Sequence, residues 1–323
     1  MAGPEAYASV TGVLTGVTAA SARNAWAVGY TSTQVVIGHW NGSRWRFTVT
    51  QRPRAFSQLH SVSATSAWGV WTVGSIGGSP APLTERLAGA SWQRVPAPNP
   101  NGDTSIGAVA AVTARDAWAV GGTPTWTVVL HWNGRSWKRF ASPSPSSSGS
   151  YLNAAAATSP DNAWAVGSSG NRTLILHWGG IKWRQSASPG LGGDPVLNGV
   201  AATSGRNAWA VGGTQDSGKT VILHWNGSSW RHITSPSPAG YSTLNAVAAT
   251  SGRAAWAVGY ASGKTLILHW NGSSWRRVPS PSPAGYSTLS GVTATSASNA
   301  WAVGYAGSNT LILHWNGRRW SRA

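Results

Sequence analysis

Hydrophobic and small side chains recur along this chain in short runs, separated by residues that favour turns. In the last copy of the pattern the runs are 289–294, 300–304, 310–315 and 319–322. The second run, Ala-Trp-Ala-Val-Gly, alternates Ala on one face with Trp and Val on the other, and the third, Thr-Leu-Ile-Leu-His-Trp, is apolar on both faces. Runs of this length and periodicity predict β-strands, and no segment has helical periodicity. The repeating unit is therefore a set of four strands.

The unit recurs seven times at a nearly constant spacing. Its second run carries a tryptophan in every copy, 45 to 47 residues after the one before, at Trp26, Trp71, Trp118, Trp164, Trp209, Trp256 and Trp301. That period, with four strands per repeat, predicts an all-β, seven-bladed β-propeller whose blades are four-stranded antiparallel sheets. We expect a single domain over 1–323, with blades at about 13–58, 59–105, 106–150, 151–196, 197–243, 244–288 and 289–323.

Each strand of the unit has a composition that predicts its place in a blade. The first strand, Leu-x-x-Val-x-Ala, carries small side chains, which suit the crowded hub where blades converge. The fourth strand begins with Trp and carries much of the arginine, which suits an outer edge that must resist strand addition. The chain starts on a first strand and ends on a fourth. Blades 1 and 7 are therefore expected to close by side-chain packing, unless residues 6–10 add a strand.

Charge and composition limit the possible binding partners of the protein and the cellular compartments in which it could act. The 24 Lys and Arg residues outnumber the 7 Asp and Glu residues, which predicts a positive field that attracts polyanions. There is no cysteine, so disulfides and thiolate chemistry are excluded. The sequence contains neither a membrane-spanning apolar run nor a secretory leader. We nevertheless expect a secreted protein that acts outside the cell as a monomer.

The motifs of the unit resemble those of known propellers. The series Leu-x-x-Val-x-Ala, Ala-Trp-Ala-Val-Gly and Leu-His-Trp-Asn-Gly-Ser-Ser-Trp resembles the Asp-box (BNR) class, especially its photosystem II assembly factor-like branch, and the Trp-rich blades resemble tectonin-type lectin propellers. The resemblance covers 14–323 and implies the architecture. Any role of the Asp-box aspartate does not transfer, because asparagine replaces it at Asn41, Asn133, Asn226, Asn271 and Asn316. The near-identical blades and the Ala, Gly and Arg bias resemble actinobacterial proteins in which a blade was amplified.

Two sets of titratable residues could suggest metal binding or catalysis, and neither set supports such a role. The third strand carries a histidine as its second-to-last residue in six blades, at His39, His131, His177, His224, His269 and His314. Equivalent positions in different blades lie far apart, so these side chains are expected to be structural and to bind no metal. Sialidase-type chemistry needs clustered acids, but the seven acidic residues are scattered over different repeat positions. We expect neither an enzyme nor a cofactor.

Aromatic residues outside the core pattern are the candidate ligand-binding residues. They follow the second strand (Tyr30, Tyr260 and Tyr305), lie in the connection from a fourth strand to the next first strand (Tyr151, Tyr241 and Tyr286), or occupy a loop of blade 3 (Trp126). These loops share one face of a propeller, so the aromatics should cluster there. Each ring either anchors its own loop or stacks on the apolar face of a sugar ring.

Because several of the blades are nearly identical in sequence, equivalent, shallow binding sites are favoured over a single evolved active site. The leading hypothesis is a non-catalytic, lectin-like module that binds cell-surface or extracellular glycans weakly at each blade and with avidity across blades. One alternative is a structural or protein-interaction scaffold, produced by blade amplification, with no dedicated small ligand. The other is polyanion binding through the arginine-rich rim, for which affinity would fall steeply with salt.

Overall fold

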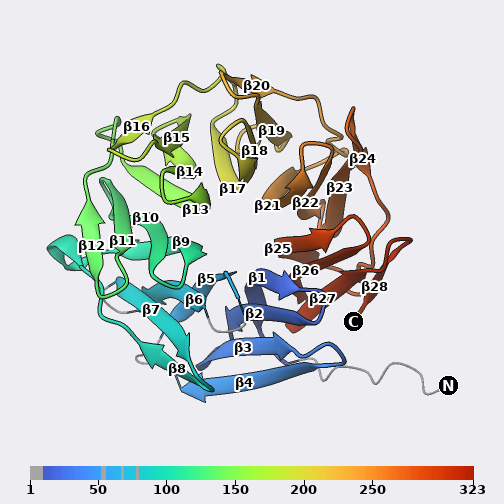
Figure 1. Cartoon of the computed structure of the whole chain (residues 1–323). Helices are drawn as coiled ribbons and strands as arrows, with labels where there is room; N and C mark the ends of the chain where they lie inside the picture. The colour runs from blue at the N-terminus through green and yellow to red at the C-terminus, as the bar shows by residue number, and fades with distance from the viewer. Residues whose placement is uncertain (1–9, 52–55, 67–68, 78–79) are drawn as a thin grey trace.

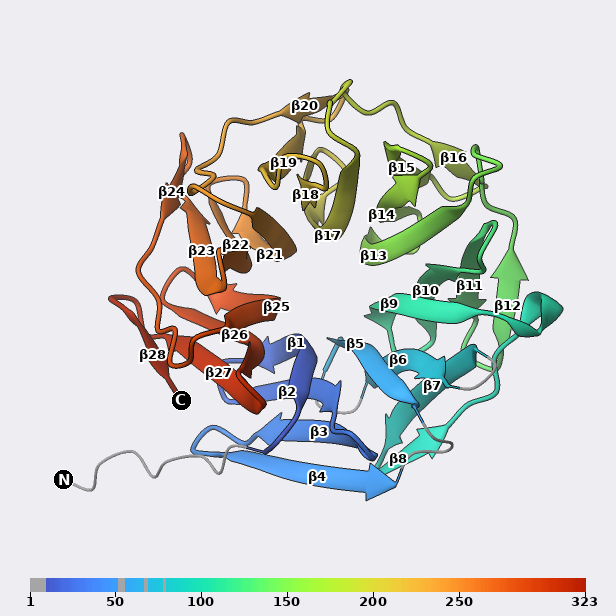
Figure 2. The same cartoon turned by 180° about the vertical axis from the view of Figure 1, so that it is seen from behind.

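Seven four-stranded antiparallel sheets stand radially around a central channel (Figure 1; Figure 2 shows the opposite side). This computed structural model describes residues 10–51, 56–66, 69–77 and 80–323. Each sheet is built from four consecutive strands, in the order first to fourth from the hub to the rim. The predicted all-β, seven-bladed propeller is confirmed. Within the described part of the chain, no helix is long and apolar enough to cross a membrane.

The strands fall into four concentric sets. The first strands are β1 (Val13–Ser21), β5 (Gln58–Ala64), β9 (Ser105–Thr113), β13 (Ser150–Ser159), β17 (Pro195–Ser204), β21 (Ser242–Ser251) and β25 (Ser287–Ser296). The second strands are β2 (Asn24–Tyr30), β6 (Val70–Ile76), β10 (Asp116–Gly122), β14 (Asn162–Ser169), β18 (Asn207–Thr214), β22 (Ala254–Ala261) and β26 (Asn299–Ala306). The third strands are β3 (Gln34–Trp40), β7 (Ala81–Ala88), β11 (Thr127–Trp132), β15 (Arg172–Trp178), β19 (Thr220–Trp225), β23 (Lys264–Trp270) and β27 (Asn309–Trp315). The fourth strands are β4 (Trp45–Gln51), β8 (Ser91–Arg94), β12 (Trp137–Phe140), β16 (Trp183–Gln185), β20 (Trp230–His232), β24 (Trp275–Arg277) and β28 (Trp320–Arg322).

The first strands of blades 2 to 7 begin one or two residues before the predicted blade boundaries. For example, β25 begins at Ser287, whereas the apolar pattern placed the boundary at Leu289. The reason is that the pattern marks apolar side chains, while the backbone ladder extends to the preceding Ser and Thr, which pair with the end of the second strand. Side-chain polarity does not report those backbone hydrogen bonds.

A one-residue bulge in every first strand explains the glycine that ends every Ala-Trp-Ala-Val-Gly motif. In blade 6 the register of β21 against β22 shifts between Leu244 and Ala246. At the same level, a Cβ on Gly259 would overlap the carbonyl oxygen of Thr243. The equivalent glycines of the other six blades meet the same obstacle. Only glycine lets the two backbones approach this closely.

The second-strand tryptophan of each blade packs into the next blade. The ring of Trp209 in blade 5 lies 5.0 Å from that of Trp270 and 5.2 Å from that of Trp275, the second pair edge to face. The same contact closes the ring, because Trp301 of blade 7 lies edge to face with Trp45 of blade 1 at 5.2 Å. Such pairs add attraction beyond the area they bury. Among the described residues, no strand of blade 1 belongs to the sheet of blade 7.

Residues 10–12 add backbone hydrogen bonds to this closure. The Gly12 N–H donates to the Ser308 carbonyl at 2.8 Å, and the Thr310 N–H donates to the Val10 carbonyl at 3.0 Å. The rest of the segment that could have added a strand, 6–9, lies outside the described residues. Residues 10–12 thus pair with the start of the third strand of blade 7.

Hydroxyl groups hold the proline-rich connections against the third strands. In blade 6 the Thr265 N–H donates to Ser282 Oγ at 2.8 Å, while Thr265 Oγ1 lies 2.8 Å from Ser280 Oγ and donates to the Pro281 carbonyl at 3.0 Å. Thr127 and its Ser-Pro-Ser segment repeat this arrangement in blade 3. These connections are therefore fixed as they cross from rim to hub, so the residues that follow them are held in place.

Candidate functional site

Four tyrosine rings form a continuous row across blades 5 to 7. Tyr241, Tyr260, Tyr286 and Tyr305 follow one another with 6.0 Å between successive ring centroids. We call these four residues the tyrosine arc. Tyr241 and Tyr286 are 46% and 45% exposed, which places them among the few large apolar side chains of the described residues that face solvent. The arc is therefore an accessible aromatic surface.

Backbone hydrogen bonds to two blades hold each exposed tyrosine of the arc. Next to Tyr286, the Ser287 N–H donates to the Gly263 carbonyl of blade 6 at 2.8 Å. The Tyr286 carbonyl accepts from the Gly307 N–H of blade 7, also at 2.8 Å. Tyr241 is held in the same way, and its ring packs so closely on Gly218 that a Cβ there would come within 2.7 Å of it. The rings are therefore positioned before any ligand arrives.

The phenol groups of the arc influence one another. Burial raises the pKa of Tyr260, and the neighbouring Tyr286 phenol raises it further through charge repulsion and a hydrogen bond. Burial also raises the pKa of Tyr305, with Tyr286 and then Tyr30 adding to the effect. The Tyr260 and Tyr305 phenols are thus neutral at physiological pH and can both donate and accept hydrogen bonds.

The structure brings together only part of the predicted aromatic set. Tyr30, at the end of β2, lies near the Tyr305 end of the arc. The prediction that Tyr151 lies in a connection between strands is wrong, because this residue lies within β13. Its side chain is half-buried, and its hydroxyl donates to the Ser105 carbonyl at 3.3 Å. Trp126 is also half-buried, packs on the core between blades 2 and 3, and has a buried indole nitrogen with no acceptor among the described residues.

The position of Tyr151 was predicted wrongly because the connection before blade 4 differs from those before blades 6 and 7. Tyr151 directly precedes the buried Leu152, whereas Tyr241 and Tyr286 stand three residues before the equivalent leucines. It therefore pairs within the sheet, opposite Ser168. Burial raises the pKa of the Tyr151 phenol, and the hydrogen bond to Ser105 opposes this rise.

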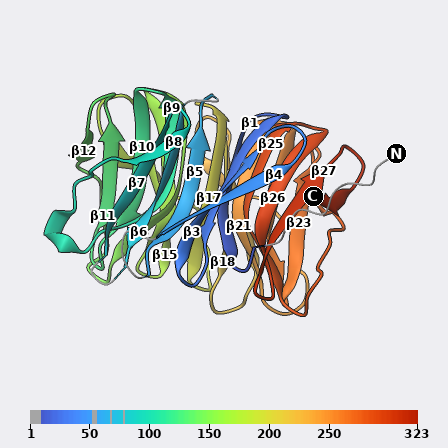
Figure 3. The ribbon, with the colours of Figure 1, turned by 90° about the horizontal axis from the view of Figure 1, so that it is seen from below.

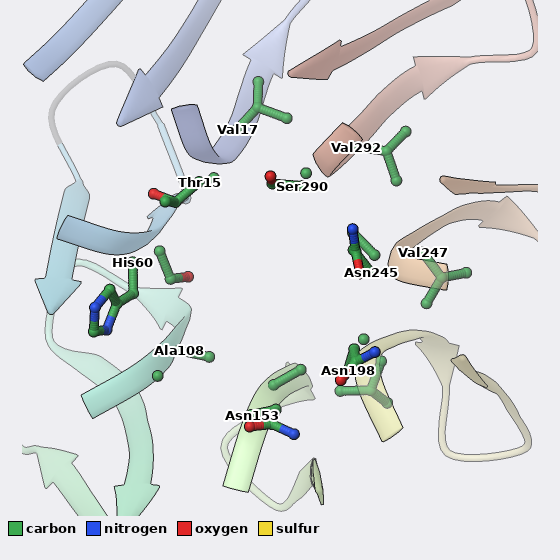
Figure 4. A pocket seen from close by; sticks show the side chains of 18 of the residues that line it. Thr15, Val17, His60, Ala108, Asn153, Asn198, Asn245, Val247, Ser290 and Val292 are labelled. Carbon is green, nitrogen blue, oxygen red and sulfur yellow. The ribbon is translucent and has the colours of Figure 1, made fainter. Parts of the chain in front are cut away.

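A polar ring around the central channel was not recognised in the sequence. Each bulge residue follows the buried leucine or isoleucine of a first strand, and the ring consists of Thr15, His60, Gly107, Asn153, Asn198, Asn245 and Ser290. Figure 4 shows the six polar side chains of the ring around a cavity of about 150 Å³. The signal that could have revealed them is a polar residue in six of seven copies at one position of an otherwise apolar strand.

The ring side chains join neighbouring blades. Asn153 Nδ2 donates to the Leu197 carbonyl at 2.9 Å, and Asn198 Nδ2 donates to the Leu244 carbonyl at 3.0 Å. Asn245, Thr15 and His60 make the corresponding bonds, so five of the seven interfaces have one. Burial lowers the pKa of His60, and its bond to the Ile106 carbonyl partly offsets this effect. The channel groups therefore primarily stabilise the closed ring.

The six third-strand histidines have structural partners. Each imidazole stacks on or tilts over the second-strand tryptophan of its own blade, as in the pair Trp301 and His314 at 4.2 Å. Five of them also bond to the side chain that begins the second strand, at Asn24, Asp116, Asn162, Asn207 and Asn299. Among the described residues, His269 alone of the six lacks this partner, because Ala254 replaces the asparagine.

Acidic groups do not gather at any one place. In the part of the chain that is described, no three His, Cys, Asp or Glu side chains lie close enough to hold a metal ion. The single ion pair found there joins His131 Nε2 to Asp116 Oδ1 at 3.0 Å. Glu85 occupies an apolar position of blade 2, where burial raises its pKa and Arg94 lowers it. The arginines are thus largely without carboxylate partners.

Comparisons with known proteins agree with this architecture. No family model and no curated protein match the chain. Among solved structures, "YCF48 bound to D1 peptide" is 16% identical with a TM-score of 0.62, over 96% of this chain and 95% of that one. YCF48 from Cyanidioschyzon merolae is also 16% identical, with a TM-score of 0.61, over 97% and 99%. The WD40 propeller domain of Doa1 is 13% identical, with a TM-score of 0.64, over 93% and 92%.

These likenesses establish the fold alone. They agree with the resemblance to photosystem II assembly factor-like propellers at the level of architecture. The resemblance to tectonin-type lectin propellers stays a prediction. Propellers often serve as binding scaffolds, and YCF48 was solved with a bound D1 peptide.

Proposed function

We propose that this protein is a non-catalytic recognition module that binds glycans through the tyrosine arc. The observation that supports this best is the row of four rings spaced 6.0 Å apart, two of them nearly half-exposed. A phenol ring offers an apolar face to the C–H face of a pyranose and a hydroxyl to its polar edge. Serine and glycine residues flank Tyr241 and Tyr286 in the sequence, and their small side chains obstruct a ligand little.

Repetition supplies the avidity that such shallow contacts need. The connections that carry Tyr241 and Tyr286 have the same sequence, Ser-Pro-Ser-Pro-Ala-Gly-Tyr-Ser-Thr-Leu, and present the ring in the same way. Two weak sites held at a fixed distance on one rigid face bind a polymeric glycan far more tightly than either does alone. This function implies that the protein acts outside the cell, which stays a prediction.

A glycan array probed at low and high salt tests the proposal, followed by titration of the best ligand. The double variant Tyr241→Ala with Tyr286→Ala should weaken binding at least tenfold, because each truncation removes a contact ring. Tyr286→Phe should retain most of the affinity, since the stacking face remains. Ile181→Ala, which truncates a side chain 84% exposed elsewhere on the surface, should change nothing. An array with no glycan bound by the intact protein would overturn the proposal.

A second candidate, recognition of an extended peptide, is favoured by one finding. The fold match to YCF48, solved with a D1 peptide, extends over nearly the whole of both chains. Aromatic rings and hydroxyls also suit a proline- or aromatic-containing peptide. A peptide array run with the same four proteins separates the two candidates. Binding of peptides that depends on the tyrosine arc, together with an empty glycan array, would favour this second function.

A further inference from the structure

The end of the molecule opposite the tyrosine arc carries a ring of arginines. The turns that join first to second strands and third to fourth strands all lie at this end of the disc, which we call the turn face (Figure 3 shows the disc from the side). Eight exposed arginines lie in these turns, at Arg23, Arg44, Arg115, Arg135, Arg206, Arg253, Arg318 and Arg319. They come from blades 1, 3, 5, 6 and 7.

Some of these arginines lie in the turn between the first and second strands, and packing against the other turn of the same blade holds them. A Cβ on Gly42, in the second turn of blade 1, would lie 3.0 Å from Arg23 Cβ in the first turn. The corresponding distance for Gly227 and Arg206 in blade 5 is 3.2 Å. The aliphatic stem of each arginine therefore lies on the adjacent Asn-Gly turn, and the guanidinium projects beyond it into solvent.

The positive charge of the turn face is not neutralised. Only two of the described acidic residues, Asp116 and Asp161, lie in or beside its turns, and Asp116 is already paired with His131. No other ion pair exists among the described residues. Eight guanidinium groups at one end of the disc thus create a positive potential that extends about one Debye length, roughly 8 Å at physiological salt.

Indole rings lie beside these arginines. The third-strand tryptophans Trp40, Trp225, Trp270 and Trp315 are partly exposed at the base of the turns. Each donates its indole N–H to a carbonyl of the first turn, as Trp270 does to Gly252 at 3.2 Å. A partly solvent-exposed tryptophan next to an arginine is a combination favoured where a protein contacts the headgroup region of a bilayer.

We propose that the turn face docks on the surface of an anionic lipid bilayer. Charges distributed around the circumference of a disc can all reach a partner together only if that partner is flat. A linear polyanion would engage a few blades at a time, whereas a lipid leaflet engages all five arginine-bearing blades at once. Each arginine held near such a leaflet improves partitioning about fivefold. The tyrosine arc remains free on the opposite face, so this inference does not depend on the proposed function.

Co-sedimentation with vesicles tests the inference. The intact protein should bind vesicles of phosphatidylcholine with 30% phosphatidylserine, chosen as roughly the anionic content of a charged leaflet. It should not bind phosphatidylcholine alone. Binding should decline steeply between about 50 and 500 mM salt, because the screening length shortens. Glutamine at the four first-turn positions (Arg23, Arg115, Arg206 and Arg253) should lower the partition coefficient by a factor of about 600, which is four fivefold losses multiplied together.

A matched variant separates location from net charge. Glutamine at Arg172, Lys219 and Lys264, near the opposite face, and at Arg277, on an outer strand, removes the same number of charges outside the turns, and all four side chains are also exposed. This control should bind vesicles nearly as well as the intact protein. Three outcomes would overturn the inference: equal binding to neutral vesicles, an equal loss in both quadruple variants, or binding to a single-stranded oligonucleotide but not to anionic vesicles. Circular dichroism melts of both variants check that each is folded.

Discussion

Replacing Ala254 with asparagine should stabilise the protein, because blade 6 lacks a hydrogen-bonding side chain that five other blades possess. In blade 7, Asn299 Oδ1 lies 2.8 Å from His314 Nε2, and its Nδ2 donates to Thr295 Oγ1 at 2.7 Å. Blade 6 has both partners in place, as His269 and Thr250. The centroid of the His269 ring lies 4.2 Å from that of Trp256, the same distance as between His314 and Trp301. The substitution would therefore add two bonds without rearranging the site.

The expected gain is about 1 kcal/mol. Each new hydrogen bond contributes about 1 kcal/mol net, and ordering the asparagine side chain costs on the order of 1 kcal/mol of conformational entropy. The site is half-buried, which keeps the bonds at the ordinary end of that range. For a protein of this size the gain corresponds to a rise in Tm of about 1–2 °C.

Urea unfolding and calorimetry of five proteins measure this effect: the parent, Ala254→Asn, Asn299→Ala, His269→Phe, and Ala254→Asn combined with His269→Phe. Asn299→Ala should lose about what Ala254→Asn gains, because it removes the same two bonds in blade 7. The combined variant should retain only the part of the gain due to Thr250, relative to His269→Phe alone. The reasoning is refuted if Ala254→Asn leaves the free energy of unfolding unchanged while Asn299→Ala lowers it.

Two further predictions concern stability. Burial lowers the pKa of His39, His177, His224, His269 and His314 below 6.5, so the unfolded chain binds more protons than the folded one as pH falls below that value. The free energy of unfolding should therefore be highest above about pH 6.5 and should decrease towards pH 5; urea titrations at pH 7.5 and 5.0 check this, and equal midpoints would contradict it. Gly259→Ala should cost about 1–3 kcal/mol, because its Cβ overlaps the Thr243 carbonyl, whereas Gly285→Ala, whose Cβ meets nothing within 4 Å, should cost far less. Equal melting temperatures for these two alanine variants would rule out the explanation given for the glycine.

The candidate site was predictable only where repetition revealed it. Tyr241 and Tyr286 stand in identical connections, so the sequence could assign both to one face. Tyr151 shares their residue type but stands next to Leu152, and two residues of shift along the chain move a side chain from a connection into a sheet. Trp126 looked like an exposed loop residue, yet it packs on the core between blades 2 and 3. Burial of a loop side chain depends on its neighbours in space.

The channel ring and the turn face depended even more on three-dimensional contacts. A polar residue after Leu197 or Leu244 has no evident partner along the chain, because the carbonyl it bonds to belongs to the next blade, 46 residues away for Asn198 and Leu244. Arg206 and Gly227 are likewise far apart in sequence, and only the blade brings their turns together. Strand composition located arginine at the rim, but it could not show that the turns gather arginine at one end.

The sequence by itself determined the number of blades, the number of strands in each and their order from hub to rim. It could do so because a period of 45 to 47 residues and the polarity of each strand are local properties that repeat seven times. The tertiary structure decided which aromatics meet, which polar groups join neighbouring blades and where unneutralised charge accumulates. Those features depend on contacts between blades, and distances across an interface are not encoded in the spacing within one repeat.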